Sequence, residues 1–460
     1  MAEEETLTME NEFVGLNFNS VRLAKRFIRT METLVAKPDK SIWTCSEDRA
    51  EAKAIYRMLS NDKLDTDEIM RVHCKQTYKR MAASGKTILK VQDTSSLNYN
   101  SQKNVEGLGY FCEQSRGLNI HSCLAVTTDG LTLGLLYQMH YSRNTPKDHT
   151  PESEKRKRDF EDKESYRWAK TFIESNEGTP EGVKTITLCD REGDIYEFID
   201  LIAGKGELFL IRITHDRLTV DNKHILDEIR KAKCEGTVQI MVPRDSRKNK
   251  KEREATIQIR YKHFEVKRPD DLKKNTSLKP SIGIWVVHAL EENPPKGEDP
   301  IEWFLMTNEP IEDFNAAFER IKYYTHRWKI ERFHFVLKTG CCEIEKNQAR
   351  SVDVKKTLIL MYSVIAVFIL NLAYLARILP NLLCDLIFEE TEWKVLYCVA
   401  NKTKEPPKEP YTIAEAVKYI GWLGGPKRAP SDGPPGVKTI WMGLETLHII
   451  LTHREYSGSG

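Results

Sequence analysis

Three acidic residues that lie far apart in the sequence could together hold a divalent cation. Asp93 and Asp190 each follow a run of residues that predicts a buried strand, over 87–92 and 184–189. In open α/β sheets, ligands gather beyond the strand ends, where two carboxylates could bind a metal ion. Aspartates at strand ends are also common caps and turn residues, so this pair alone is weak support for a metal site.

The third acid, Glu331, lies on a helix predicted over residues 312–338. Residues one or two helical turns away share its face, and one more projects near it. These are Tyr324, Arg327 and Lys338, with His334 near the face. A solvated face with an ion pair between Arg327 and Glu331 would account for these charges. However, neighbouring aromatic residues indicate that the helix is packed and that its charges point at a ligand. They are Tyr323, Trp328, Phe333 and Phe335.

This set of side chains suits phosphoryl transfer on DNA, which needs positioning and charge neutralisation more than covalent help from the protein. Two Mg²⁺ ions about 4 Å apart can stabilise both the attacking and the leaving oxygen. Mg²⁺ prefers hard oxygen ligands and keeps several waters, so three carboxylates suffice. Arg327 and Lys338 would bind the phosphates beside the scissile bond. We therefore expect Mg²⁺ as the cofactor, with Mn²⁺ able to replace it.

The N-terminal part of the chain is predicted to be helical. Helices are expected over residues 21–35, 47–59 and 66–83. On the first helix, four basic residues share one face and apolar residues occupy another. The basic residues are Arg22, Lys25, Arg26 and Arg29. Such helices suit a small DNA-binding domain, although a solvated charged face would give the same pattern.

After residue 86 the pattern changes to strands. Two apolar runs, 121–128 and 131–140, are separated by Asp129-Gly130, a strong hairpin signal. Residues 215–310 are mostly β, with many prolines, and the remainder of the chain is again helical. Residues 357–376 contain no charged residue and reach the length of a membrane span. A helix buried on all sides in a large protein fits the same stretch, and we favour it.

The composition is that of an ordinary globular protein. The 460 residues suggest two or three domains, and 70 Lys and Arg nearly balance 68 Asp and Glu. A balanced total does not exclude nucleic acid as a ligand, because the position of the positive charge decides binding. The 10 cysteines include no Cys-x-x-Cys pair, so neither a zinc site nor a disulfide framework is predicted. The acidic N-terminus lacks the pattern of a signal peptide, and we expect a cytoplasmic, nucleoid-associated protein.

Three blocks of sequence contain the acids. They are Asp93-Thr94-Ser95-Ser96-Leu97, Cys189-Asp190-Arg191-Glu192-Gly193-Asp194-Ile195, and Tyr324-Thr325-His326-Arg327-Trp328-Lys329-Ile330-Glu331 followed by Phe333-His334 and Lys338-Thr339-Gly340. In residue types and spacing they resemble the DDE (Asp-Asp-Glu) cut-and-paste transposases of bacterial insertion sequences, in the branch with the Tyr-Arg-Glu-Lys signature. The resemblance covers most of the chain and includes segments 54–61, 293–310 and 423–444.

The resemblance implies an α+β protein. It would have a ribonuclease H-like catalytic core with an all-β insertion, flanked by helical N- and C-terminal domains. We expect a helical DNA-binding domain in residues 1–85 and a catalytic domain in 86–378, with the insertion at about 215–310. A helical C-terminal domain, 379–460, is expected to aid dimerisation. In this arrangement the apolar helix near residues 357–376 belongs to the core, so no membrane is expected.

The resemblance also implies roles for single residues. Asp93, Asp190 and Glu331 would be the catalytic residues and the metal ligands. Trp303 would stack on a base flipped out of the transposon end, although a core tryptophan on a strand fits equally well. The expected DNA contacts are Tyr324, Arg327, Lys338, Trp303, His334, Arg22 and Arg26.

The implied reaction is cut-and-paste transposition of double-stranded DNA. Mg²⁺-dependent hydrolysis at the transposon end is followed by hairpin formation, hairpin opening and strand transfer into target DNA. One active site for each end implies a homodimer in a paired-end complex. Two alternatives remain open: a transposase-derived DNA-binding protein, which the presence of all three acids argues against, and a related nuclease without strand transfer.

Overall fold

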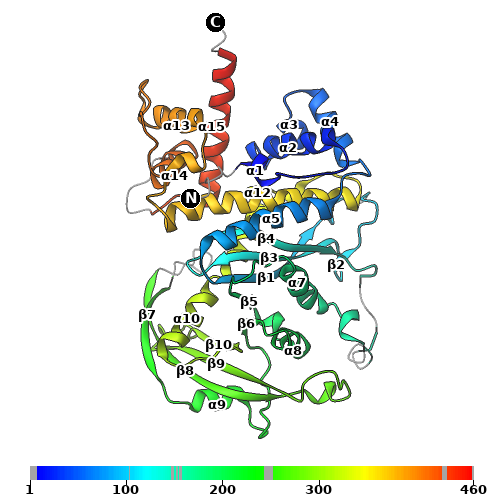
Figure 1. Ribbon diagram of the computed structural model, residues 1–460, viewed down its shortest axis with the longest axis vertical. Coiled ribbons are helices and arrows are strands. Elements are labelled where there is room, and N and C mark those ends of the chain that lie inside the picture. Colours follow the sequence, from blue (N-terminus) through cyan, green and yellow to red (C-terminus); the bar gives the residue numbers. More distant parts are fainter. Residues whose placement is uncertain are drawn as a thin grey trace.

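The computed structural model describes residues 8–102, 104–146, 150–151, 154, 158–242, 252–426 and 433–457. A ten-stranded mixed sheet runs through the molecule in the order β2-β3-β1-β5-β6-β10-β9-β8-β7, with β4 paired to β3 (Figure 1). The strands are β1 Ile88–Asn98, β2 Tyr110–Cys112, β3 Ser115–Thr127, β4 Thr132–Tyr141, β5 Thr185–Cys189, β6 Leu208–Arg212, β7 Gly236–Val242, β8 Arg253–Lys267, β9 Ser281–Glu292 and β10 Glu302–Thr307.

Helices form the two ends of the chain and lie against the sheet. They are α1 Met9–Glu12, α2 Val21–Ala36, α3 Ile42–Cys45, α4 Arg49–Leu59, α5 Thr66–Ser84, α7 Tyr166–Asn176, α8 Tyr196–Gly204, α9 Ile225–Lys231, α10 Phe314–Thr325, α11 Trp328–Phe335, α12 Val352–Ile378, α13 Glu390–Asn401, α14 Ile413–Leu423 and α15 Val437–Ser457. Short 3₁₀ turns are η1 Phe160–Asp162, η2 Arg191–Gly193, η3 Asp270–Leu272, η5 Ile344–Lys346 and η6 Cys384–Leu386, and η4 Val336–Gly340 is a π turn. A mixed α+β protein with helical ends was predicted, and this is confirmed.

The strand that carries Asp93 is longer than predicted. β1 pairs antiparallel with β3 along its whole length, from Ile88 to Asn98. Its parallel pairing with β5 stops at Val91. Asp93 therefore lies inside β1 and not at its end, which corrects the sequence-based prediction, because β3 continues to offer backbone partners beyond it. The residue still lies just past the point where the neighbouring parallel strand ends.

The predicted hairpin between β3 and β4 is present. Thr127 donates its N–H to the Leu131 carbonyl at 2.9 Å, and Gly130 occupies the turn with a φ of 92°. Only glycine adopts this backbone conformation without strain, so Asp129-Gly130 sets the turn.

The insertion between β6 and α10 is not all-β as predicted. It contains the helix α9, on which Ile225 and Ile229 are fully buried one turn apart. Acidic residues in its first turn and basic residues in its last turn complement the helix dipole. The insertion also continues the main sheet, because β10 pairs antiparallel with β6, and β9, β8 and β7 follow in turn.

The helix predicted over residues 312–338 is broken. α10 ends at Thr325 and α11 begins at Trp328. Between them the backbone keeps helical angles, but hydrogen bonds tighten to three residues, from Arg327 N–H to the Tyr324 carbonyl at 3.0 Å. His326 leaves the helix axis to contact the Thr128 carbonyl at 2.9 Å, so a tertiary contact with the hairpin accounts for the break.

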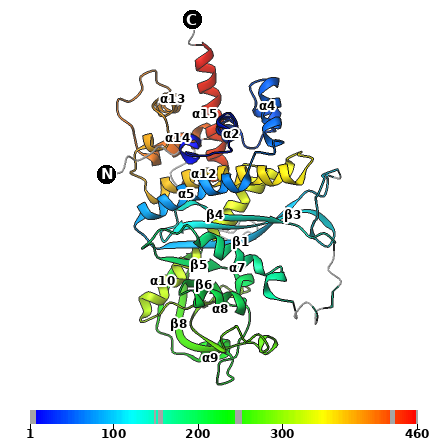
Figure 2. The same cartoon turned by 45° about the vertical axis from the view of Figure 1, so that its right-hand side comes forward.

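The N-terminal helices follow the predicted pattern. On α2, the apolar face is buried (Leu23, Phe27, Met31 and Leu34) and the basic residues point outward. α5 has a different environment, because it lies on the sheet beside β4 together with α12 (Figure 2). The third predicted helix thus packs with the sheet, although the domain was predicted to extend to residue 85.

α12 is the one helix in the described residues that is long and apolar enough to cross a membrane. In its most apolar window, 83% of the residues are buried inside the protein. It runs between the sheet with α5 below and the N- and C-terminal helices above (Figure 1). The prediction that this segment is a buried core helix is confirmed.

Candidate active site

The three predicted acids come together from distant parts of the chain. The Asp93 carboxyl lies in the sheet, and burial together with the charges of Asp190 and Glu331 raises its pKa to about 7. The Thr94 N–H, which donates to Asp93 Oδ1 at 2.8 Å, and the Arg327 cation act in the opposite direction. Asp93 is therefore a crowded carboxyl whose charge is opposed by two neighbouring carboxylates.

β5 and η2 position Asp190. All five residues of β5 are buried, so the strand is firmly packed between β1 and β6. Asp190 follows directly and caps η2, where its Oδ1 accepts the Glu192 N–H at 2.8 Å. The negative charge of Asp190 acts on the carboxyl of Asp93.

α11 positions Glu331 in its first turn, where Arg327 donates a charged hydrogen bond to it. In the part of the chain that the structure describes, no three His, Cys, Asp or Glu side chains stand close enough to bind one ion without adjustment. Glu331 is instead paired with Arg327. The chemistry of the donors nevertheless fits Mg²⁺, because all three offer hard oxygens and a cation would relieve the repulsion on Asp93.

His334 and Lys338 lie at the same site, as predicted from the helix face. His334 Nδ1 is 3.8 Å from Asp93 Oδ2. Burial lowers the pKa of His334 to about 3, with a smaller effect from Lys338, so the imidazole is neutral. Lys338 donates to the Ser96 carbonyl of β1 at 2.6 Å and lies 3.8 Å from Glu345. The lysine is therefore tied to the strand that carries Asp93.

Tyr324 and Trp303 form an aromatic pair at the edge of the site. Their ring centroids are 5.4 Å apart in an edge-to-face arrangement. Tyr324 is buried, and burial raises its pKa to about 12, so its hydroxyl is protonated. Trp303 is half-buried at the start of β10, so part of its ring remains accessible.

Arg167 of α7 is a site residue that the sequence analysis missed. Its Nε donates to Thr94 Oγ1 at 3.0 Å, and its Nη2 lies 2.7 Å from Glu192 Oε2. Thr94 also contacts His121 Nδ1 at 2.7 Å. Arg167 thus links the residue after Asp93 to the turn that Asp190 caps. No local spacing marks it, because the link exists only in the folded protein.

Arg212 was also missed, although, like Asp190, it lies at the end of a strand of the sheet. It ends β6, the strand next to β5, and the charges that act on it include Arg191, Tyr324 and Arg327. Burial and the Arg191 cation lower the pKa of Arg212, which remains a cation. Positive charge therefore surrounds Tyr324 beside the acids, as an anionic substrate would require.

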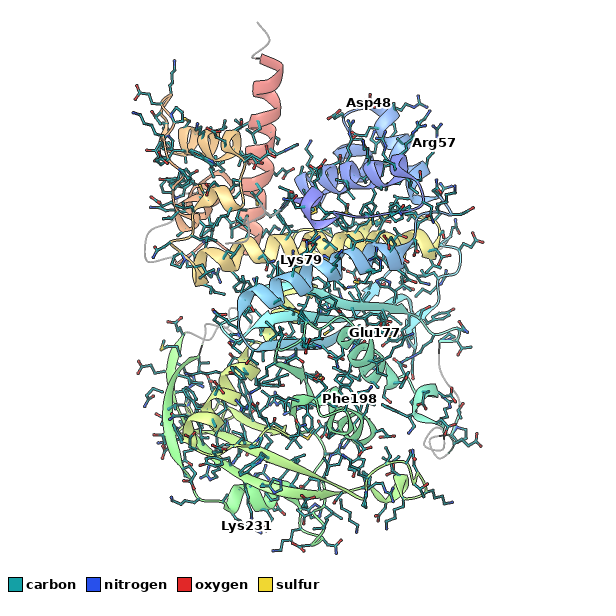
Figure 3. All side chains as sticks on the ribbon, viewed as in Figure 1. Asp48, Arg57, Lys79, Glu177, Phe198 and Lys231 are labelled. Atoms are coloured by element: carbon teal, nitrogen blue, oxygen red, sulfur yellow. The ribbon has the colours of Figure 1, made fainter. Side chains whose placement is uncertain are left out.

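Arg22 and Arg26 do not belong to this site. They lie on α2, among the N-terminal helices above the sheet (Figure 1). The outer face of α4 adds further exposed cations, Arg49, Lys53 and Arg57. Figure 3 places Arg57 at the outer edge of these helices. The structure therefore has a second cationic surface, separate from the acids.

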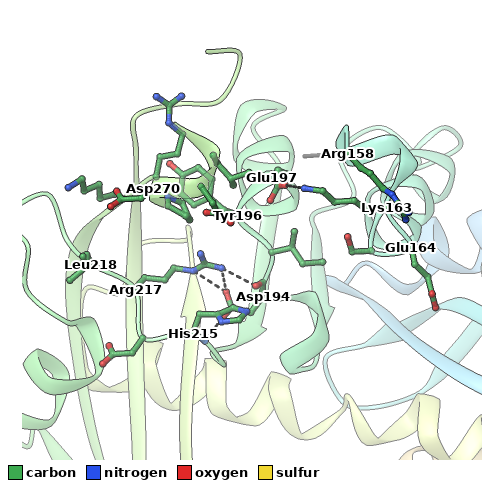
Figure 4. A pocket seen from close by; sticks show the side chains of 18 of the residues that line it. Arg158, Lys163, Glu164, Asp194, Tyr196, Glu197, His215, Arg217, Leu218 and Asp270 are labelled. Carbon is green, nitrogen blue, oxygen red and sulfur yellow. Dashed lines mark hydrogen bonds and ion pairs between the residues drawn. The ribbon is translucent and has the colours of Figure 1, made fainter. Parts of the chain in front are cut away.

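The largest of five cavities compared in the described residues, about 890 Å³, is not lined by any of the three acids. Figure 4 shows that Arg217 points at Asp194 and Lys163 at Glu197. Arg217 binds the buried Asp194, with Nε at 3.1 Å from Oδ1, and Lys163 binds Glu197 at 3.0 Å. These pairs neutralise much of the cavity wall, so its size alone does not mark a site of chemistry.

Comparisons with known proteins identify the two ends of the chain. Residues 7–64 match the family model described as transposase DNA-binding, and residues 364–460 match the transposase Tn5 dimerisation domain. The first match ends before α5, and the second begins within α12. These matches support a DNA transposase that binds DNA and forms a homodimer. Both properties were predicted from the sequence.

One solved structure is similar over much of the chain. It is a cryo-EM structure of a piggyBac transposase synaptic complex with hairpin DNA. The sequences are 9% identical, the TM-score is 0.36, and the match covers 80% of this chain and 71% of the other. A TM-score this low does not establish a shared fold.

Proposed function

We propose that the protein is a Mg²⁺-dependent DDE transposase whose catalytic acids are Asp93, Asp190 and Glu331. The observation that carries this proposal is the convergence of three carboxylates from β1, β5 and α11, with the charges of two of them acting on the third. A carboxyl whose pKa is strongly raised by burial and by neighbouring carboxylates is typical of a functional site. The transposase domains matched at both ends of the chain support DNA as the substrate of such a site.

We further propose that β4, β3, β1, β5 and β6 form a ribonuclease H-like core. Three antiparallel strands continue directly into two parallel strands in this part of the sheet, which supports the proposal. Asp93 lies on β1 and Asp190 directly follows the neighbouring strand β5, where nearby carboxylates would reach a common ligand.

Mg²⁺ bound at the acids would polarise the scissile phosphate and activate the attacking oxygen. The chain's own residues would position the DNA. Arg327, Arg212 and Lys338 would bind phosphate oxygens, and the neutral His334 would hold the Asp93 carboxylate in place. Arg167 would hold β1 and η2 in their positions relative to each other. Because phosphoryl transfer needs little covalent help, positioning and charge account for most of the expected rate.

The proposed reaction begins when water attacks the phosphorus at the transposon end. The bond to the 3′ oxygen breaks, which leaves a 3′-hydroxyl on one side and a 5′-phosphate on the other. The 3′-hydroxyl then attacks a phosphorus of the opposite strand, which joins the two strands of the transposon end in a hairpin and releases the flanking DNA with its own 3′-hydroxyl. A second water reopens the hairpin, and the restored 3′-hydroxyl finally attacks target DNA. Two subunits would hold two ends in a paired complex, in keeping with the dimerisation domain.

Trp303 would support the hairpin step. A base that leaves the stack needs an aromatic surface, and Trp303 offers the accessible part of its ring beside Tyr324. Arg22 and Arg26 of α2 would bind the transposon end at the DNA-binding domain, with the exposed cations of α4 nearby.

The decisive experiment is incubation of the full chain with DNA that contains the flanks of its own gene, with Mg²⁺. Excision at defined ends followed by joining to a second DNA is the expected result. Cleavage without joining would indicate a nuclease that lacks strand transfer. Binding without cleavage would indicate a DNA-binding protein. Glu331→Gln serves as the inactive control, because it keeps the side-chain size but removes the charge.

A further inference from the structure

Three cations lie near one another where α11 meets the end of α12, and two of them contact the ring of Tyr374. Lys329 Nζ lies 3.2 Å from the centre of the Tyr374 ring, and the Arg377 guanidinium lies 5.6 Å from the same ring. Arg332, one turn after Trp328, lies 5.1 Å from the Phe335 ring. We call Lys329, Arg332 and Arg377 the Tyr374 cluster. It joins α11 to the last turn of α12.

The positive charge of this cluster is not neutralised by acidic side chains. The charged neighbours that act on Lys329 are Arg377 and Arg332, which are also cations. The Arg377 guanidinium donates to the neutral carbonyl of Pro435 at 3.4 Å. None of the ion pairs within the described ranges includes a member of the cluster, whereas the charges of the largest cavity are mostly paired. Three cations held together without an anion form a surface that attracts one.

The position of the cluster favours a long anion. On an α-helix Arg332 points about 100° away from Glu331, and Lys329 points about 160° away, so the cluster lies on the side of α11 that is turned away from the acids. Lys329 packs near the β3–β4 turn, because a Cβ on Gly130 would lie 3.1 Å from its Cε. Arg377 is exposed at the beginning of the C-terminal helices. The cluster thus joins the glutamate helix to the region matched to the dimerisation domain, which includes Tyr374 and Arg377.

We propose that the Tyr374 cluster binds the phosphate backbone of duplex DNA, independently of sequence, on the side of α11 that is turned away from the acids. The inference rests on the proposed function, in which the protein acts on DNA. DNA carries a negative charge about every 1.7 Å along its axis, so neighbouring cations of α11 and α12 can contact successive phosphates of one duplex. The cation–π contacts hold Lys329 and Arg377 in place, which reduces the entropy lost when phosphate binds.

The test measures how strongly salt weakens DNA binding. The full chain is titrated with a fluorescent duplex of random sequence at salt concentrations from about 50 to 200 mM. Each lost phosphate contact lowers the slope of log affinity against log salt by about 0.9. We expect the double variant Arg332→Gln with Arg377→Gln to lower the slope by roughly 1 to 2 and the affinity at low salt about tenfold. Glutamine keeps much of the side-chain length, so the melting temperature should not change.

The matched control is Lys418→Gln. Lys418 is an exposed lysine on α14 that also rests on an aromatic ring, 5.1 Å from the centre of Trp422. Its loss should leave the slope unchanged. A second variant, Arg377→Glu, reverses charge at an exposed position and should weaken binding further than Arg377→Gln without affecting folding.

Three results would overturn the inference. An unchanged slope in both cluster variants would mean that the cations serve packing only. A loss of dimerisation, seen by sedimentation, with unchanged DNA binding for each remaining dimer would assign the cluster to a partner subunit. Inorganic phosphate that competes as well as the duplex would point to a small anion and would also contradict it. Failure of the proposed function is seen separately, because wild-type protein would then bind duplex but not cut it.

Discussion

His334 Nδ1 lies 3.8 Å from Asp93 Oδ2, which joins α11 to the middle of β1. Because burial keeps this imidazole neutral, with a pKa of about 3, the contact does not neutralise the aspartate. It fixes the distance between the strand and the helix that carries Glu331. Packing therefore brings the acids together, although their charges oppose one another.

The first prediction separates cutting from binding. Glu331→Gln should lower strand cleavage by more than about a hundredfold, because even partners behind a metal ligand cost 10–100-fold when lost. Binding to transposon-end DNA should change little, since the cations of α2 and α4 remain. Cleavage assays and gel shifts on the same preparation measure both. Glu319→Gln on α10, an exposed glutamate, is the control. An equal loss of binding and cleavage would assign Glu331 to DNA binding.

The second prediction concerns metal binding and protons. The pKa of Asp93 is raised from 3.8 to about 7, so near pH 6 most of this carboxyl is protonated and near pH 8 most is ionised. Mg²⁺ binds the ionised form. Adding Mg²⁺ at about pH 6 should release up to one proton per site, and at about pH 8 far less. Calorimetry in buffers of different ionisation enthalpy counts these protons. Proton release that persists in Asp93→Asn would show that another group is responsible.

The third prediction tests Arg167 as a positioning residue. Arg167→Ala removes the link between Thr94 and Glu192, so it should slow cleavage about 10–100-fold and raise the Mg²⁺ concentration needed for half-maximal rate. Lys170→Ala, exposed on the same helix, should do neither. Arg167→Lys should recover part of the activity. A merely structural role would lower the melting temperature without shifting the Mg²⁺ dependence.

The fourth prediction concerns Trp303 and separates the first nick from hairpin formation. Trp303→Ala should leave the first nick largely intact and reduce hairpin formation, because stacking is worth about 1–3 kcal/mol per base. The residue is only half-buried, so the melting temperature should fall by a few degrees at most. Trp303→Phe keeps an aromatic surface, so its rate of hairpin formation should lie between those of the wild type and Trp303→Ala. Marked instability, or nicking and hairpin formation that decline together, would make Trp303 a packing residue.

The fifth prediction concerns acid stability at the N-terminus. Burial would raise the pKa of Glu12, but His73 and Arg80, at 2.6 Å and 2.7 Å, outweigh it and lower the pKa from 4.5 to about 2. A lowered carboxyl pKa stabilises the fold above pH 4.5, and this stability is lost as the pH falls toward 2. The difference between 4.5 and about 2 corresponds to about 3 kcal/mol.

Glu12→Gln should therefore lower the urea midpoint at pH 7, and the difference from wild type should shrink below about pH 4. Glu10→Gln on the same helix is the control. A difference that stays constant down to pH 2 would show that the variant disturbs packing instead.

Local patterns predicted the elements well. The strands before Asp93 and Asp190, the turn at Gly130 and the apolar face of α2 all depend on residues near one another in sequence. The grouping of the three acids followed from a family resemblance together with strand-end positions. The structure brings these residues together, and their catalytic roles remain to be measured.

Contacts between distant segments account for what sequence did not predict. β1 runs past Asp93 because β3 supplies partners, and the helix before Glu331 breaks because His326 contacts the Thr128 carbonyl. Arg167 and the Tyr374 cluster arise the same way, from side chains that meet only across packed elements. The hydrophobic periodicity of one segment contains no information about its contacts with distant segments.

The long insertion between β6 and α10 also sets an order in time. During synthesis, N-terminal domains generally fold first. The helices matched to the DNA-binding domain are complete early, Asp93 and Asp190 follow, and five strands must be made before Glu331 leaves the ribosome. With Glu331 as the third ligand, a growing chain would be able to bind DNA before it could cut it. Incomplete chains would then compete with complete ones for DNA ends.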